Sequence, residues 1–336
     1  MGVAALVAAT VAGGALLAPG GAVPAGVADS QPTRAFSLVY SVDIIEIPEG
    51  ARHVQAWLPI PQTDEHQEIT GLRVEAPIRH RLLRDPEYGN LILALEGDAP
   101  LPASVPIRLE ADVRRHSQRA DLTGAGDAAS PGGKGVSRPP ARYLEADRLV
   151  PIDGRIAEIA RDVTKGRKTA LDKARAIYDY VTGSMRYDKS GEGWGKGDAT
   201  RACDVRTGNC SDFHALFIGL ARAARIPARF QMGFPLPEGK PEGVIPGYHC
   251  WAEFFVPDRG WVPVDCSEAS KNPERLEFYF GSLDPHRVRF TTGRDVQIEG
   301  LPEGNPLNFF IYPVVEVDGK PHEAVTREVR FADRHS

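Results

Sequence analysis

The period of the hydrophobic pattern changes along this chain of 336 residues, and that change sets the fold class. From Phe36 to about Val113, apolar and polar residues alternate in stretches such as FSLVYSVDIIEI, which predicts antiparallel strands. After residue 143 the apolar spacing becomes three and four, as in ALDKARAIYDYVTGSM, which predicts helices. Strand-like patterns return from PARFQMGF onward. The sequence therefore predicts an α+β protein in which an all-β, sandwich-like domain precedes a mixed region.

Shifts in composition place the boundaries of these regions. Residues 1–28 combine an apolar run with small residues ahead of position 29, which predicts a signal peptide and export to the periplasm or the extracellular space. We expect the β-sandwich domain at 34–118, a Gly/Pro-rich linker or loop at 119–142, and the mixed domain with C-terminal strands at 143–333. The leading apolar run is too short and too rich in Gly and Ala for a confident membrane span, so none is predicted in the mature chain. A disordered Ala/Gly leader or a membrane anchor is the alternative to a signal peptide.

Composition and motifs exclude several kinds of partner and cofactor. A formal net charge of −5, without Lys/Arg runs that carry interleaved aromatics, gives no sign of a nucleic-acid partner. The sequence has no dinucleotide-binding or P-loop glycine motif, and its acidic residues lack the spacing of a calcium loop. We therefore predict no cofactor and no metal. Nothing in the sequence sets the oligomeric state.

The segment RTGNCSDFHALF, residues 206–217, contains the first candidate for chemistry. An apolar stripe from Phe213 to Ala224 predicts a helix, and Cys210 lies in its first turn. Backbone N–H groups there lack helical partners, and the helix dipole favours an anion, so a thiolate would be stabilised. The same N–H groups could receive the oxyanion of an attacked carbonyl. By itself, however, a cysteine in such a place is equally well a small buried apolar residue.

A nucleophilic thiol needs a base, and His249 is the better placed of two candidates. The segments HCWAEFF and WVPVD predict two strands joined by a short turn near Asp258. If His249 pairs opposite Asp265, the numbers of each two opposite residues sum to 514. An imidazole oriented by this Asp would then complete a Cys-His-Asp relay. His214 lies four residues after Cys210 on the same helix, and we expect it to pack or to support the site. A purely structural His249–Asp265 hydrogen bond is the alternative.

Other arrangements of the cysteines stay open at this point. A zinc site built from Cys203, Cys210, His249 and Cys266 is one alternative, although no C-x-x-C pair supports it. In the register above, Cys250 and Cys266 are diagonal neighbours, so a disulfide between them would require the strand pairing to shift.

Three motifs in order resemble the transglutaminase-like superfamily of cysteine enzymes. They are Cys210 within GNCSDFHALFIGLARAARIPARF, His249 within GYHCWAEFF, and Asp265 within GWVPVDCSEA. The resemblance covers roughly residues 150–285 and implies a helix that carries the cysteine packed on an antiparallel sheet. It also implies Cys210 as nucleophile, His249 as general base and then acid, and Asp265 as the orienting carboxylate. Trp194 and, less directly, Asn209 are candidates for a second oxyanion donor.

The resemblance implies acyl transfer on amide bonds through a thioester. Water as acceptor gives a peptidase or amidase, which we favour, and an amine gives a transglutaminase that cross-links proteins or incorporates amines. The expected substrate is a protein, a peptide or a peptidoglycan-like amide. A non-catalytic peptide- or glycan-binding protein on the same fold is the alternative from another functional class.

Overall fold

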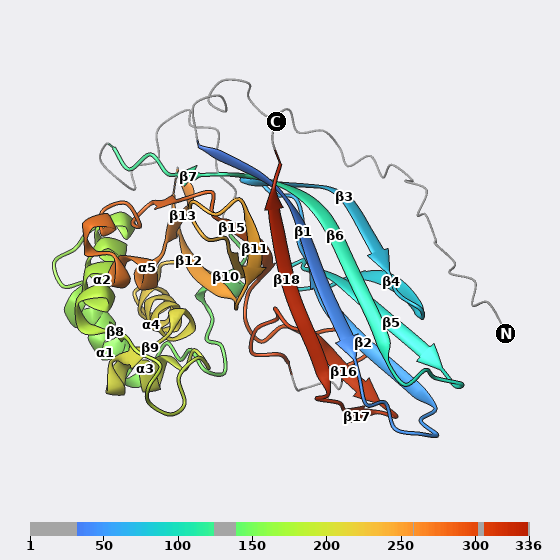
Figure 1. Cartoon of the computed structure of the whole chain (residues 1–336). Coiled ribbons are helices and arrows are strands. Elements are labelled where there is room, and N and C mark those ends of the chain that lie inside the picture. The colour runs from blue at the N-terminus through green and yellow to red at the C-terminus, as the bar shows by residue number, and fades with distance from the viewer. Residues whose placement is uncertain (1–31, 124–138, 258, 302–305, 335–336) are drawn as a thin grey trace.

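A computed structural model describes residues 32–123, 139–257, 259–301 and 306–334 (Figure 1). The predicted signal peptide, 1–28, lies outside the described residues, as does the centre of the predicted linker, 124–138. None of the helices within the described ranges has the length and apolar character needed to traverse a bilayer.

Two five-stranded sheets form a β-sandwich. The first has the order β11 (Glu242–Ile245), β18 (Val325–Asp333), β1 (Thr33–Ile44), β6 (Val105–His116), β3 (Gln67–Glu75). The second has the order β17 (Lys320–Pro321), β16 (Val314–Val317), β2 (His53–Ile60), β5 (Leu91–Asp98), β4 (Arg79–Arg84). Alternate residues of β1 are buried, as the period of two predicts.

In the described ranges, a four-stranded antiparallel sheet and five helices lie beside the sandwich. The sheet has the order β13 (Gly260–Val264), β12 (His249–Val256), β10 (Ala228–Pro235), β15 (Arg287–Thr292). The helices are α1 (Gly154–Val163), α2 (Ala170–Ser184), α3 (Ala199–Val205), α4 (Cys210–Ala223) and α5 (Cys266–Lys271). Helix α4 packs on β12, and the sheet lies between the helices and the sandwich (Figure 1). This arrangement confirms the predicted α+β class, with a cysteine-bearing helix on an antiparallel sheet.

Short elements complete the fold. They are β7 (Gln118–Arg119) with β14 (Ser282–Leu283), the parallel pair β8 (Arg186–Tyr187) with β9 (Thr207–Gly208), and the single 3-10 turns at Ala141–Leu144 and Pro273–Arg275. The pair β8–β9 ends two residues before Cys210 and therefore fixes the approach of the chain to α4.

The C-terminal strands differ from the predicted boundary at 143–333. Strands β16, β17 and β18 pair with β2 and β1 and so complete the two sheets of the sandwich, and β11 adds to the edge of β18. Their period of two is the same in either sheet, so the pattern contains no information about which strand each one pairs with. The sandwich is thus assembled from both ends of the chain.

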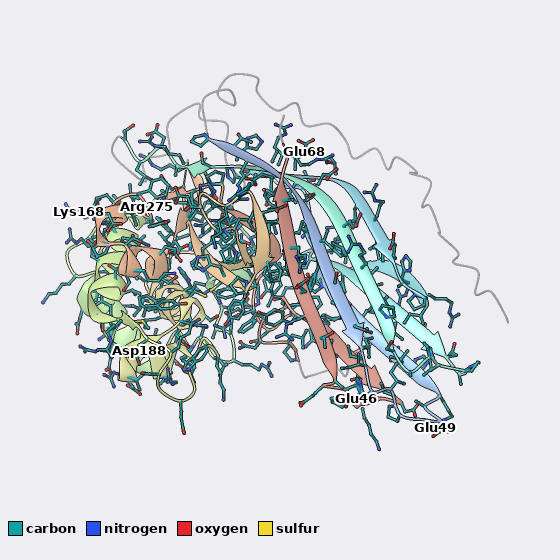
Figure 2. The ribbon with its side chains drawn as sticks, in the orientation of Figure 1. Glu46, Glu49, Glu68, Lys168, Asp188 and Arg275 are labelled. Carbon is teal, nitrogen blue, oxygen red and sulfur yellow. The ribbon has the colours of Figure 1, made fainter. Side chains whose placement is uncertain are left out.

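The sandwich and the helical half share one hydrophobic core. Tyr40 of β1 makes edge contacts with Phe234 of β10 and Phe290 of β15, with ring centroids 5.8 and 6.2 Å apart. Of the charged side chains at the surface, Glu46 and Glu49 are at the far end of the sandwich, and Lys168 and Asp188 are on the helical side (Figure 2). The apolar contact between the halves holds the sheet that carries the candidate site.

Candidate active site

The N-terminus of α4 positions Cys210. Asn209 is the N-cap, and its side-chain oxygen accepts a hydrogen bond from Ser211 N–H over 2.9 Å. The carboxylate of Asp212 accepts from Asn209 N–H over 2.9 Å, which completes a capping box. Cys210 is therefore the first helical residue, at the positive end of the helix dipole, as the sequence predicts.

Asp212 also holds the loop that faces the cysteine. Its two carboxylate oxygens accept hydrogen bonds from Gly195 N–H over 2.7 Å and Gly197 N–H over 3.1 Å. This buried carboxylate fits because Gly208 has no side chain: a Cβ there would lie 2.3 to 2.7 Å from atoms of Asp212. The glycine of the GNC segment, Gly208, thus leaves room for the carboxylate that organises the site.

We expect Gly208→Ala to loosen this arrangement. The added methyl group would displace Asp212 and cost about 1–3 kcal/mol of unfolding free energy, the usual penalty of overpacking. Urea denaturation of the variant measures that loss. Gly191→Ala is the matched control, because Gly191 lies outside the helices and strands and a Cβ there meets no atom within 4 Å. Equal stability of both variants with the wild type would contradict the packing argument.

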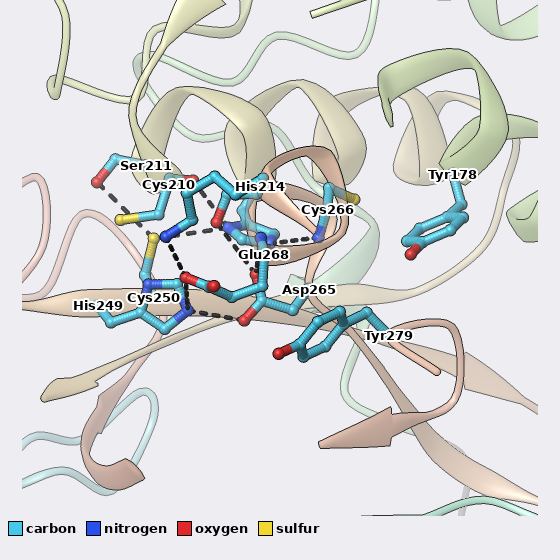
Figure 3. A network of polar contacts seen from close by, with 12 residues as sticks. Tyr178, Cys210, Ser211, His214, His249, Cys250, Asp265, Cys266, Glu268 and Tyr279 are labelled. Carbon is cyan, nitrogen blue, oxygen red and sulfur yellow. Dashed lines mark hydrogen bonds and ion pairs between the residues drawn. The ribbon is translucent and has the colours of Figure 1, made fainter. Parts of the chain in front are cut away.

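His249 and Asp265 meet at one end of the four-stranded sheet (Figure 3). The distance from His249 Nε2 to Asp265 Oδ2 is 2.7 Å, and both side chains are buried. The predicted register is wrong by two residues: Ala252 pairs with Val264, so paired numbers sum to 516, because the turn is centred one residue later than a sum of 514 requires. Since a shift of two keeps every side chain on its face, His249 and Asp265 become diagonal neighbours and still touch.

Arg287 of β15 is a site residue that the sequence analysis missed. Its Nη1 donates to Asp265 Oδ2 over 2.9 Å, and its Nη2 donates to Asp284 over 3.2 Å. Burial opposes ionisation of Asp265, but the positive charges of His249 and Arg287 hold its pKa well below the ordinary value. Asp265 is thus a carboxylate at neutral pH, and His249 Nε2 bears the proton between them.

The second ring nitrogen of His249, Nδ1, is left for Cys210. A hydrogen bond with the Cys250 thiol, together with the hydrogen bond and charge of His249, holds the pKa of Cys210 well below its ordinary value despite burial. Burial lowers the pKa of His249, but the interactions with Asp265 and Cys210 outweigh it and raise the pKa to about 10. At neutral pH the pair is therefore a thiolate beside an imidazolium.

His214 is a structural partner of this site. The backbone N–H of Cys266 donates to His214 Nε2 over 3.0 Å, so that nitrogen is an acceptor. Nδ1 then carries the proton and donates to the carbonyl oxygen of Cys210 over 2.8 Å. Burial lowers the pKa of His214, in keeping with a neutral ring. His214 thus ties α4 to the start of α5 and has no free nitrogen with which to act as a base.

The part of the chain that contains this geometry resembles known proteins. Residues 157–266 match the family model of the Transglutaminase-like superfamily. This segment of the chain is thus similar to that superfamily. Over 323 residues it is 26% identical to an uncharacterized protein of Haemophilus influenzae, covering 85% of this chain and 86% of that one.

Two further proteins are similar to this chain. A crystal structure from Cytophaga hutchinsonii, described as a candidate cysteine protease, superposes with a TM-score of 0.62 at 17% identity and covers 91% of this chain and 92% of that one. A protein-glutamine gamma-glutamyltransferase of Pseudomonas aeruginosa is 34% identical over 79 residues, which are 22% of this chain and 12% of that protein. The first comparison shows a shared fold.

The two predicted oxyanion donors have different surroundings. The Asn209 side chain is used, since its oxygen caps α4 and its Nδ2 donates to Tyr248 Oη over 2.9 Å. Trp194 is 37% exposed, and a Cβ on the next residue, Gly195, would lie 3.3 Å from Asn209. Trp194 therefore belongs to the loop beside the cysteine, and its role as donor stays a prediction.

The remaining cysteines form neither the disulfide nor the zinc site considered above. All four are free, so no Cys250–Cys266 disulfide is present. Within the described ranges no three His, Cys, Asp or Glu side chains are grouped so that they could hold a metal ion, so the zinc alternative is not supported. Cys250 instead lies against α4, with its sulfur 3.6 Å from His214 Nδ1 and 3.8 Å from Ser211 Oγ (Figure 3).

Proposed function

We propose that this protein is a cysteine-dependent enzyme that cleaves or transfers amide bonds through a Cys210-His249-Asp265 triad. One observation supports it above the others: His249 is hydrogen-bonded to a buried carboxylate on one ring nitrogen and interacts with a thiol of lowered pKa through the other. A buried structural histidine needs only one of these two contacts.

The proposed reaction begins with attack of the Cys210 thiolate on an amide carbonyl. Among the described residues, Cys210 N–H has no hydrogen-bond acceptor, so it is free to donate to the oxyanion, and Trp194 is the second candidate donor. His249 then gives its proton to the leaving amine as the C–N bond breaks and the thioester forms. Finally His249 accepts a proton from water, whose oxygen attacks the thioester; the C–S bond breaks, the acid leaves, and the Cys210 thiolate and the His249 imidazolium are restored.

Hydrolysis is the favoured outcome, and transfer to an amine is the second candidate. The second rests on the similarity of a short segment to a protein-glutamine gamma-glutamyltransferase. Incubation with protein, peptide and peptidoglycan-fragment substrates, with and without dansylcadaverine, separates the two. Release of new amino groups without label indicates a peptidase or amidase, and incorporation of the label indicates a transglutaminase. If neither product forms from any of these substrates, the result supports the non-catalytic binding protein instead.

Export belongs to the same proposal. The prediction rests on residues 1–28 of the sequence, with Ala28 as the last residue before cleavage. Expression of the full chain in a bacterial host followed by intact mass measurement of the periplasmic and cytoplasmic fractions tests it. We expect the exported form to begin at Asp29. Full-length protein found only in the cytoplasm would contradict export.

A further inference from the structure

A cavity of about 390 Å³ lies between the four-stranded sheet and the sandwich. On one side it is lined by Trp251 and Glu253 of β12, which alternate with the residues of β12 that face α4. On the other side it is lined by residues 62–66, which follow β2, and by Arg115 of β6. Cys210, His249 and Asp265 do not line it, so it is separate from the candidate active site.

Most charged groups around this cavity have partners within the protein. Arg229 Nε donates to Glu253 Oε2 over 2.6 Å, and Arg289 Nε donates to Asp64 Oδ2 over 2.6 Å. Burial raises the pKa of Glu253, but Arg229 and hydrogen bonds from neighbouring amides outweigh it and lower the pKa to about 2. Each of these two carboxylates is therefore neutralised by its own arginine.

Arg115 is the exception. Its side chain is 2% exposed, yet among the described residues it donates no hydrogen bond, and its Nε is without any partner. The carboxylate of Asp64 lies 4.0 Å from Nη1, beyond hydrogen-bond distance, and is already paired with Arg289. Burial lowers the pKa of Arg115 to about 10, so the guanidinium is still charged at neutral pH.

A buried guanidinium without acceptors is costly to fold, and such groups in native proteins are usually satisfied by a ligand or water. Arg115 presents a planar fork of donors, which matches two oxygens of one carboxylate or phosphate. The aromatic side chains of Trp251 and Trp261 line the same cavity. The cavity therefore offers one anion-binding group beside surfaces suited to the apolar part of a small molecule.

We propose that this cavity is a binding site for a small molecule or chain end that bears a carboxylate or a phosphate, held by Arg115. The site lies apart from the amide chemistry proposed above and does not depend on it. Because Trp251 contacts both the His249 ring, at 6.3 Å between centroids, and the Arg287 guanidinium, at 5.2 Å, an occupant would lie one side chain away from the triad.

Tryptophan fluorescence tests this proposal on the full chain. Two of the four tryptophans line the cavity, and Trp57→Phe with Trp194→Phe removes the signal of the other two. Titration with succinate and, separately, with inorganic phosphate, at ionic strength held constant with sodium chloride, distinguishes the two anions. We expect a saturable change with at least one of them. The Cys210→Ala variant should bind equally well, which separates this site from the proposed enzyme activity.

Arg115→Met should weaken that binding at least about tenfold, the usual effect of losing a charge-assisted hydrogen bond. The affinity of Arg115→Lys, which keeps the charge but not the planar set of donors, should lie between those of the wild type and Arg115→Met. This variant serves as the test if the methionine variant does not fold. Arg73→Met, on the exposed face of β3, is the matched control and should bind as the wild type does. No saturable change with either anion, or equal affinity in the wild type and both Arg115 variants, would overturn the proposal.

Discussion

Replacing Cys210 with alanine is expected to reduce turnover of an amide substrate by roughly 10³-fold or more while the protein stays folded. The thiolate forms the bond that the mechanism depends on, and removal of a nucleophile from a triad leaves only the contribution of binding and oxyanion stabilisation. The added cavity is small, because alanine differs from cysteine by one sulfur atom. Initial rates on the substrate found in the screen, together with a thermal melt, measure both parts of the expectation.

Cys203→Ala is the matched control for that experiment. Cys203 lies on α3 with the same exposure as Cys210, 3%, and burial raises its pKa, so it should contribute nothing to turnover. We expect Cys203→Ala to keep wild-type rates within about twofold. If Cys210→Ala kept those rates as well, the proposed nucleophile would be wrong, whatever the activity of the protein turned out to be.

The second large effect concerns stability, through Arg287. Arg287 is 3% exposed and is the only cation besides histidine whose nitrogen lies within 4 Å of Asp265 among the described residues. In Arg287→Met, Asp265 and Asp284 would lose this buried cation, and breaking such a pair by removing one partner costs about 3–5 kcal/mol. Urea denaturation at pH 7 measures the loss.

Arg275→Met provides the comparison for Arg287. Arg275 also faces Asp284, at 3.6 Å, but its side chain is 33% exposed, so its removal should cost no more than about 1 kcal/mol. The loss in Arg287→Met should shrink at low pH, where protonation removes the negative charge of Asp265. A loss in Arg287→Met no larger than that in Arg275→Met would show that the buried pair is not the main support of Asp265.

The sequence predicts the local parts of this fold well, because periodicity depends on near neighbours. The strands of residues 36–113 and the helix that opens at Cys210 both follow from it. Periodicity does not predict which strands pair with each other. Strand β18 lies beside β1, almost 300 residues away in sequence, and an alternating pattern is equally compatible with any sheet that has one buried face.

The site shows the same division between local and distant information. Cys210, His249 and Asp265 could be proposed because each stands in a motif, and a register error of two residues did not separate them. Arg287 stands in no motif. It reaches Asp265 only because β15 is brought beside β10, and a lone arginine in a strand gives no signal of its own. Arg115 was missed for the same reason, since the cavity that it lines exists only between the two halves.

The central claim, that His249 and Asp265 keep Cys210 as a thiolate, is tested most directly by alkylation. The intact protein is treated with iodoacetamide from pH 5 to pH 9, and the rate at each cysteine is followed by peptide mass spectrometry. A lowered pKa means that the thiolate is lost only as the pH falls through that low value, so the rate at Cys210 should change little between pH 6 and pH 8.

Cys203, which is equally exposed but has a raised pKa, should react at pH 6 at roughly 1% or less of its rate at pH 9. In His249→Gln, the reactivity of Cys210 at pH 6 should fall, because the hydrogen bond and the charge of His249 are lost while the hydrogen bond with Cys250 remains. A Cys210 rate that rises with pH as that of Cys203 does in the wild type, or that is unchanged by His249→Gln, would contradict the account.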